Sequence, residues 1–376
     1  MTLMVRDEAD IIGSMIDHHL SQGVDTIIVT DNGSVDGTVE ILRSYGDAIV
    51  LKQDPVQRKQ QHSVVTAMAR EAYTRFGADW VINADADEFW LPAADVRTLR
   101  EVFADIPREL RTFTVPVIDM VGAASLRGTG LQRLRYRDTR SLTRMNEIGL
   151  HSHSTANSVH IGDESIEVAQ GNHYVNLEAM GTLPAHLAIE VLHFPWRSWE
   201  QFERKVRNSG KAYESNPDLQ PSPNHHGMRE YRRWQRGTLQ SFYVLRHPTE
   251  EEIQRGTLNG ELSLDSRIAD AVPSPVADET LDPLIEQASR MFGPMLSANE
   301  QELRLQAELS ANRIQELLGF IDEAKQRIDG LLADVVNLEA ASTLREASLT
   351  AELAAMHSRK IVRLTDAVRR ATQGRF

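Results

Sequence analysis

Three carboxylates stand within four residues at the end of a short apolar segment, and they carry the strongest chemical signal in the chain. Asp85, Asp87 and Glu88 follow the segment 80–82, whose tryptophan, valine and isoleucine predict a strand. On an extended backbone, Asp85 and Asp87 point to the same side and Glu88 points to the other. Because adjacent carboxylates repel each other, the two aspartates indicate a hard divalent cation that is shared with substrate phosphates. The alternative is a polar strand end whose acids are solvated.

The segments upstream of these carboxylates alternate between strand and helix patterns. They are a strand at 2–8, a helix at 11–20, a strand at 26–30, an acidic turn at 31–38, a helix at 39–45, a strand at 48–51 and a helix from 55 to about 76. This alternation predicts an open α/β sheet. Ligands of such sheets bind at the carboxyl ends of the strands, where Asp31 and the Asp85/Asp87 pair both fall.

Three ordered motifs in this region resemble those of family 2-like glycosyltransferases with the GT-A fold. They are residues 6–10 (Arg-Asp-Glu-Ala-Asp), 31–38 (Asp-Asn-Gly-Ser-Val-Asp-Gly-Thr) and 85–89 (Asp-Ala-Asp-Glu-Phe), and the resemblance covers residues 1 to about 260. It implies a Rossmann-like α/β catalytic domain with a mixed open sheet and flanking helices. It also implies a nucleotide-sugar donor, Mn²⁺ or Mg²⁺ as cofactor, and transfer of the sugar to a hydroxyl of a glycan or lipid-linked acceptor, usually with inversion.

The same resemblance gives individual residues expected roles. Asp31 would contact the base or ribose, Asp85 would face the ribose and the metal, and Asp87 would bind the metal. A late histidine often completes the metal site of GT-A enzymes, and His193, which follows the apolar segment 188–192, resembles that histidine. The full set expected to bind the nucleotide sugar is Arg6, Glu8, Asp31, Asn32, Arg58, Lys59 and Asp85.

Positive charge is expected where the diphosphate leaves. Arg58 and Lys59 stand at the start of the helix predicted from 55, where a helix N-terminus also favours phosphate; an ordinary solvated cap is the alternative. More cations lie in the stretch 196–245, which is predicted to be helical, and they either face the diphosphate or form a solvated helix face. They are Arg197, Arg204, Lys205, Arg207 and Lys211.

An inverting displacement also needs a general base for the acceptor hydroxyl. The base must be a carboxylate on the opposite side of the sugar from the leaving group. Position along the chain makes four residues candidates: Glu147, Asp163, Glu164 and Glu190. Of these, we predict Glu190 or Glu147 to be the catalytic base.

Composition excludes several other classes of protein. The 376 residues carry a net charge of −13, which argues against general nucleic-acid binding. Cysteine is absent, so disulfides and thiolate chemistry are excluded, and a reducing cytoplasm suits the chain. No apolar run reaches the roughly 18 residues that a membrane span needs, and no signal peptide is visible. We therefore expect a cytoplasmic protein.

The C-terminal third departs in composition from the catalytic domain, which we expect over 1–262. Prolines punctuate 263–297, which is predicted to be a linker, whereas 298–357 contains none. There an a/d heptad register extends over four heptads, with Ile314, Ile321, Ile328 and Val335 at a and Leu317, Ala324, Leu331 and Leu338 at d. β-Branched residues at a and mostly leucine at d favour a parallel two-stranded coiled coil, and hence a homodimer. The alternative is a long amphipathic helix that packs on its own domain.

The tail, 358–376, reverses the charge of the chain. It carries six lysines or arginines and one aspartate, with apolar residues on one side. A basic amphipathic helix suits the surface of an anionic membrane, which suggests peripheral contact with its inner face. A cationic helix C-terminus is the alternative.

Two further functional classes stay open at this point. A nucleotidyltransferase acting on sugar phosphates also needs paired carboxylates and a metal, but it usually has a glycine-rich phosphate loop near the N-terminus, and residues 6–8 contain no glycine. A non-catalytic scaffold built on the coiled coil is the other class, and the intact Asp85 and Asp87 argue against it.

Overall fold

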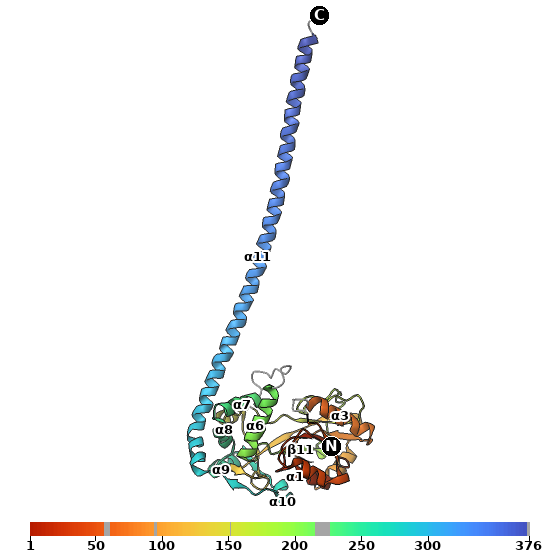
Figure 1. The fold of residues 1–376 in the computed structure, drawn as a ribbon, viewed down its shortest axis with the longest axis vertical. Helices are drawn as coiled ribbons and strands as arrows, with labels where there is room; N and C mark the ends of the chain where they lie inside the picture. The colour runs from red at the N-terminus through yellow and green to blue at the C-terminus, as the bar shows by residue number, and fades with distance from the viewer. Residues whose placement is uncertain (56–60, 94–95, 151, 215–225, 374–376) are drawn as a thin grey trace. The chain divides into compact units, whose positions relative to one another are not determined.

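The structure is a computed structural model that describes residues 1–55, 61–93, 96–150, 152–214 and 226–373. The chain divides into two compact units, Met1–Glu300 and Gln301–Phe376, called here the first and the second unit. Helices flank the strands of the first unit (Figure 1).

The predicted alternation of strands and helices at the N-terminus is confirmed. Its elements are β1 (Thr2–Val5), α1 (Ile12–Ser21), β2 (Ile28–Asp31), α2 (Thr38–Ser44), η1 (Gly46–Ala48), β3 (Val50–Gln53), α3 (Gln61–Thr74) and β4 (Trp80–Ile82). β1, β2 and β3 form a parallel sheet in that order, with Val5 opposite Asp31. Thr2 forms a parallel bridge with Asn83, so the chain after β4 continues beside β1. The carboxyl end of β1 and the carboxylates after β4 therefore lie at one edge.

The remaining strands make the sheets mixed. They are β5 (Glu88–Pro92), β6 (Thr112–Val115), β7 (Val117–Val121), β8 (Ser125–Arg127), β9 (Tyr136–Asp138), β10 (Asn157–Ile161), β11 (Ile189–His193), β12 (Leu262–Leu264) and β13 (Glu279–Thr280). β4, β10 and β6 form an antiparallel sheet. β12, β9, β7, β11 and β5 form a mixed sheet, and β13 pairs with β8. β11 runs antiparallel to β5 and parallel to β7, with His193 opposite both Glu88 and Asp119. This register brings a histidine to the acidic edge.

Helices of the first unit cover the sheets and line the edge. They are α4 (Leu99–Asp105), η2 (Arg108–Leu110), α5 (Leu142–Glu147), η3 (Ala185–Leu187), α6 (Trp199–Glu214), α7 (His226–Gln235), α8 (Leu239–Arg246), α9 (Glu250–Asn259) and α10 (Arg267–Ala271). α6 and α7 pack so closely that a side chain at position 210, which is Gly210, would overlap the ring of Tyr231. α6 buries Phe202 and Val206 on this side. Its opposite side is left to face the edge of the sheet.

The main hydrophobic core lies between the parallel sheet and the mixed sheet. Ile12 and Ile16 of α1, Val29 of β2, Phe89 of β5 and Val191 of β11 are all fully buried in it. The ring of Phe89 packs edge-on against that of Phe194. Because the core reaches the strand ends, the loops that follow β1, β4 and β11 start from fixed positions.

The segment 263–297 is not the linker that its prolines suggest. It contains α10, β13 and the start of α11 (Pro283–Gln373), and its Ile268, Val272 and Leu281 are buried in the first unit. Pro294 lies inside α11. Prolines marked the turns between short elements in this segment, but the apolar residues between them pack on the domain.

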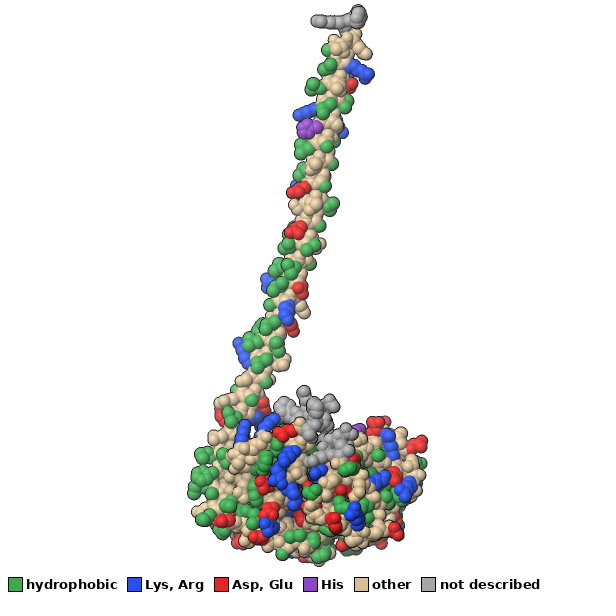
Figure 2. All heavy atoms as spheres, viewed as in Figure 1, with side chains coloured by type: hydrophobic (Ala, Val, Ile, Leu, Met, Phe, Trp, Pro, Cys, Tyr) green, Lys and Arg blue, Asp and Glu red, His purple; other side chains and the backbone are tan. Residues whose placement is uncertain are grey.

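The second unit consists of the continuation of α11. Every described residue from 302 to 373 is exposed, including the predicted a and d positions, with Ile314 at 56% and Leu331 at 58%. Apolar side chains are distributed along this helix (Figure 2). The tail up to Gln373 is part of the same helix. Within the described residues, no helix is both long enough and apolar enough to span a membrane.

Candidate active site

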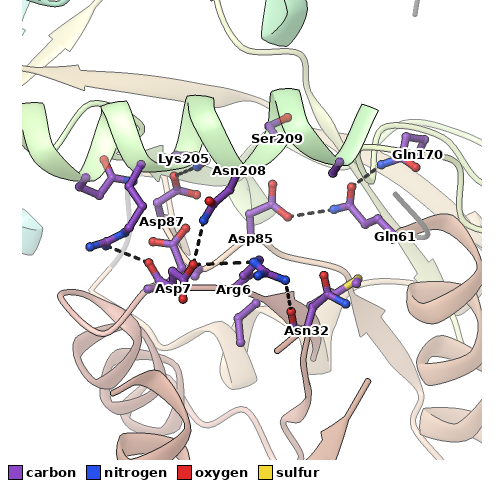
Figure 3. Close-up of a pocket in the computed structure, with 17 residues that line it drawn as sticks. Arg6, Asp7, Asn32, Gln61, Asp85, Asp87, Gln170, Lys205, Asn208 and Ser209 are labelled. Carbon is purple, nitrogen blue, oxygen red and sulfur yellow. Dashed lines mark hydrogen bonds and ion pairs between the residues drawn. The ribbon is translucent and has the colours of Figure 1, made fainter. Parts of the chain in front are cut away.

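A cleft of about 270 Å³ opens at the edge where β1 and β4 end. Arg6, Asp7 and Glu8 line it after β1, and Asp85 and Asp87 line it after β4. α6 closes the other side with Arg204, Lys205, Asn208, Ser209 and Ala212, and Asn32, Gln61, Gln170 and Gln201 complete the polar lining (Figure 3). The cleft therefore combines two acidic motifs with a cationic helix face.

Asp87 lies at the base of the cleft with three cations around it. It is 1% exposed, and its Oδ2 lies 2.5 Å from the Nζ of Lys205 and 3.5 Å from Nη1 of Arg197. Its Oδ1 lies 3.7 Å from Nε2 of His193. Burial alone would raise the pKa of the Asp87 carboxyl, but Lys205, His193 and Arg197 outweigh burial and hold that pKa well below its ordinary value. Asp87 is therefore an anion at neutral pH.

His193 is held between two aspartates. Its Nδ1 donates to Oδ1 of Asp119 over 2.9 Å, and Asp119 is also fixed by a 2.6 Å hydrogen bond from the hydroxyl of Ser154. Burial opposes a charge on the imidazole, but Asp87 and Asp119 raise the pKa of His193 to about 10. The ring therefore presents Nε2 to Asp87 in a fixed orientation.

Asp85 and Glu88 are less strongly compensated. Burial and the neighbouring Asp87 raise the pKa of the Asp85 carboxyl, whose Oδ1 accepts a 3.1 Å hydrogen bond from the side chain of Gln61. Glu88 does not line the cleft; its carboxylate accepts from Asn157 and from the backbone N–H of Asp85. Of the three carboxylates, only Asp85 and Asp87 face the cleft.

The atoms around Asp87 fit part of the ligand set of a divalent cation. Oδ1 of Asp87 is buried, has no hydrogen-bond partner among the described residues and faces Nε2 of His193 at 3.7 Å. One cation can reach both atoms once His193 has released its Nε2 proton, because ligand distances are about 2.0 to 2.2 Å. Asp119 orients His193 as carboxylates orient metal-bound histidines in other proteins. Among the described residues, no group of three or more histidine, aspartate or glutamate side chains is arranged to hold a metal by itself, so phosphate oxygens would have to supply further ligands.

The loop after β1 is fixed by several polar contacts. Asp7 has a left-handed φ of 56°, which is uncommon for a residue other than glycine. Its carboxylate accepts from the backbone N–H of Val35 and from the side chain of Asn208 on α6, both over 2.8 Å. Arg6 donates to the backbone carbonyl of Asn32 over 2.7 Å. The first two motifs and α6 are thus joined across the cleft.

Arg197 connects the same loop to Asp87. Its guanidinium is fully buried and donates to Glu8 over 2.5 Å and to Asp10 over 2.8 and 3.1 Å. It also donates to the carbonyl of Phe194 and lies 3.5 Å from Asp87. Burial raises the pKa of Glu8 to about 7 although Arg197 acts in the other direction. A single buried cation therefore holds carboxylates from two motifs.

Asp31 and Asn32 occupy different positions from each other. Asn32 lines the cleft, and its side chain donates to the backbone carbonyl of Asp54. Asp31 is buried outside the lining, and its carboxylate accepts from the backbone N–H groups of Gly33 and Ser34 at 3.1 to 3.3 Å. Asp31 shapes the loop in this structure, and contact with a base or ribose would be additional to that.

Neither retained candidate for the general base lines the cleft. Glu190 forms a bidentate pair with Arg137 at 2.8 and 2.7 Å and a second ion pair with Arg267. Although burial acts in the opposite direction, these two arginines lower the pKa of Glu190. Glu147 is exposed at the end of α5 and pairs with Arg144. These contacts give both glutamates structural partners in place of an acceptor hydroxyl.

Other candidates from the sequence lie apart from the cleft or outside the structure. Asp163 and Glu164 do not line the cleft. Arg58 and Lys59 lie outside the described residues. Of the predicted cations, Arg204 and Lys205 line the cleft and Arg197 contacts Asp87, whereas Arg207 and Lys211 do not line it.

Sequence reasoning missed Asp119 and, apart from Asn32, the amide side chains of the cleft. Asp119 is found only through the register of β7 with β11. Asn208 lies four residues after Arg204, a helical spacing that could have placed both on one face. Gln61 and Gln170 form a 2.6 Å hydrogen bond although they are far apart in the chain, and no local pattern indicates that contact.

Residues 3–159 match the family model described as "Glycosyl transferase family 2". The mixed sheets with flanking helices agree with the GT-A fold. A search of curated proteins finds no match to the chain.

Solved structures similar to the chain include three of TarS from S. aureus. The structure of TarS has 14% identity and a TM-score of 0.29, and the match covers 78% of this chain and 53% of that chain. TarS 1-349 in complex with UDP has 13% identity and a TM-score of 0.26, with 69% and 79% covered. The complex with UDP-GlcNAc has 12% identity and a TM-score of 0.28, with 68% and 72% covered. The chain thus spans about half the length of the first of these structures.

Proposed function

We propose that the first unit transfers a sugar from a nucleotide-diphosphate donor to a hydroxyl of a glycan or lipid-linked acceptor, with inversion and with the help of Mn²⁺ or Mg²⁺. One observation carries this proposal. Asp85 and Asp87 follow β4 and face a polar cleft, inside a segment that matches the family model of glycosyl transferase family 2. The cleft lies at the carboxyl ends of strands, where open α/β sheets bind their ligands.

The side chains around the cleft suit the separate tasks of this reaction. Asp87, Asp85 and His193 would hold the cation, with Asp119 fixing the imidazole. When bound, a divalent cation neutralises charge on the leaving diphosphate. Lys205 and Arg204 on α6 would add positive charge on the same side, and Arg6, Glu8 and Asn32 line the part of the cleft after β1 and β2, where a nucleoside would be recognised.

The test is a screen of nucleotide sugars with Asp87→Asn beside the unmodified chain. UDP and UDP-GlcNAc with Mn²⁺ are the first probes, followed by other nucleotide sugars, with thermal stabilisation and donor hydrolysis as readouts. Asp87→Asn should fold and lose most turnover, because an amide at this buried position cannot balance the surrounding cations or a metal. Asp47→Asn, at an exposed position, is the matched control and should match the unmodified chain.

Two results would contradict the proposal. One is equal nucleotide-sugar affinity with and without a chelator, which would show that donor binding needs no metal. The other is full turnover by Asp87→Asn, which would show that Asp87 is not part of the active site. The anomeric configuration of the first product, read by NMR, tests inversion separately.

We also propose that the second unit pairs with a second copy of the chain. The a and d side chains of its heptads are exposed in the single chain, and burial of such a stripe is the main source of stability for a long helix. The cationic residues near its end, Arg359, Lys360, Arg363, Arg369 and Arg370, are all exposed on α11. We expect them to bind anionic vesicles in preference to neutral ones, which co-sedimentation would measure.

A further inference from the structure

We propose that Lys205 is the resident counterion of Asp87 before the donor binds, and that it must leave Asp87 for a divalent cation to bind there. The proposal rests on the metal-dependent transfer proposed above and adds a role for a residue of α6. Lys205 would stay paired with Asp87 until metal and nucleotide bind together. Its ammonium would then move from Asp87 to the diphosphate.

The three cations around Asp87 differ in how firmly they are held. Arg197 has a fully buried side chain and is fixed by Glu8, Asp10 and the carbonyl of Phe194. His193 is fixed by Asp119. Neither side chain can move away without breaking several contacts.

Among the described residues, Asp87 is the one hydrogen-bond and ion-pair partner of Lys205, although the charge of Glu8 also attracts its ammonium. The side chain of Lys205 is 43% exposed. The backbone of α6 is fixed by packing of Val206 and by the close approach of Gly210 to α7. Rotation of the four-carbon side chain is therefore enough to move the charge, and no helix shift is required.

Lys205 and a metal compete for the same carboxylate. The ammonium lies 2.5 Å from Oδ2 of Asp87, while Oδ1 is the buried oxygen without a partner that faces His193. A divalent cation on Oδ1 would lie close to the ammonium, and the two positive charges would repel each other in a poorly solvated site. The carboxylate thus favours one added cation at a time.

The displaced ammonium of Lys205 could bind a diphosphate at the face of α6 that lines the cleft. Asn208, Ser209 and Ala212 follow Lys205 along the face of α6 that lines the cleft, and Arg204 lies on the same face (Figure 3). A diphosphate in the cleft would present oxygens to this face. A nucleotide would therefore attract Lys205 away from Asp87 while adding ligands for the metal, so each would strengthen the binding of the other.

The experiment measures Mn²⁺ affinity without nucleotide, by electron paramagnetic resonance of free Mn²⁺. The unmodified chain is compared with Lys205→Met and with Lys211→Met, which removes the same charge from the same helix outside the cleft. Lys205→Met should bind Mn²⁺ about tenfold more tightly or better, since a charged hydrogen bond no longer competes. Lys211→Met should stay within about twofold of the unmodified chain. Adding Asp87→Asn to Lys205→Met should abolish the gain, which places the binding at Asp87.

A second measurement follows the coupling between the two ligands. UDP should strengthen Mn²⁺ binding to the unmodified chain by a larger factor than it does in Lys205→Met. Equal Mn²⁺ affinity of Lys205→Met and the unmodified chain would overturn the counterion role, as would the absence of Mn²⁺ binding by every variant. If donor hydrolysis persists in the unmodified chain under either result, the transferase function stands and only the role of Lys205 is lost. If no nucleotide sugar binds or reacts, the proposed function fails whatever the Mn²⁺ affinities are.

Discussion

Asp87 and Glu190 are two buried carboxylates whose cationic neighbours lower their pKa. Glu190 is paired within the fold, whereas Asp87 faces the cleft. Glu190 forms ion pairs with two arginines that also pair with Asp265, so its charge is neutralised inside the fold. Asp87 keeps one oxygen beside the cleft that has no hydrogen-bond partner in the part of the chain that the structure describes. The sequence shows an acid in both places, and only the pairing of distant strands and loops reveals which one faces a ligand.

His193 gives the first residue-scale prediction. If it binds the metal, His193→Ala should weaken Mn²⁺ affinity in the presence of UDP by about tenfold or more, because a ligand and its oriented donor atom are both lost. Isothermal titration is the measurement. His357→Ala, on an exposed part of α11, is the control and should leave the affinity unchanged. Identical metal affinity in His193→Ala would make His193 a structural residue.

His160 gives a prediction for the pH dependence of stability. It is fully buried in β10, and burial lowers its pKa to about 4 from an ordinary value of 6.5. The unfolded chain therefore binds a proton that the folded chain does not, so stability falls as the pH drops from 6.5 towards 4. The contribution is at most about 3 kcal/mol.

The check is chemical denaturation across that pH range. His160→Gln should lose less free energy of unfolding between pH 6.5 and 4 than the unmodified chain loses. His357→Gln, at an exposed histidine, should follow the unmodified chain. Parallel curves for all three proteins would show that His160 is not a buried neutral histidine.

α6 is the element on which the cleft depends most. It carries Arg204, Lys205 and Asn208 on one side and packs Phe202 and Val206 on the other. The stretch 196–245 is predicted to be helical, and its cations are predicted either to face the diphosphate or to form a solvated helix face. The distance of α6 from Asp87 could not be predicted, because that distance is set by contacts with α7 and with the loop after β1.

Gly210 tests how closely α6 must pack. A methyl group there would overlap the ring of Tyr231 on α7, so Gly210→Ala should cost about 1 to 3 kcal/mol of unfolding free energy. Donor affinity should fall as well, because α6 would shift at the cleft. Gly319→Ala, in open space on α11, should stabilise its helix by up to about 1 kcal/mol and leave donor binding unchanged. Unaltered stability and affinity in Gly210→Ala would show that α6 tolerates displacement.

The strands and helices of the N-terminal half were the most predictable elements. Apolar segments such as 26–30 and 80–82 have strong patterns of their own, and β2 and β4 lie there. The prolines of segment 263–297 predict a linker, whereas apolar residues between them, such as Ile268, are buried in the first unit. The pairing of β11 with β7, which brings Asp119 to His193, depends on long-range contacts that no local pattern contains.

At the scale of the whole molecule, the heptads predict assembly. Ile321→Asp with Ile328→Asp would place like charges in each strand of the seam, and the chain should become monomeric by light scattering. Gln326→Asp with Ala333→Asp adds the same charges at the outer f positions and should leave a dimer. Both variants should retain donor hydrolysis, because the cleft lies in the first unit. A monomer for the unmodified chain at micromolar concentration would refute the coiled coil.

Arg197 has a consequence for the local stability of the cleft. One buried guanidinium binds Glu8 and Asp10 and lies beside Asp87, so opening either the loop after β1 or the loop after β4 would remove carboxylate charge from a buried cation. Active-site loops in many proteins instead exchange their amide hydrogens through cheap local openings. Here the amides of residues 7–10 and 85–88 should exchange only as slowly as the surrounding core. Little ordering would then be required when the donor binds, and its affinity would depend mainly on the contacts it makes.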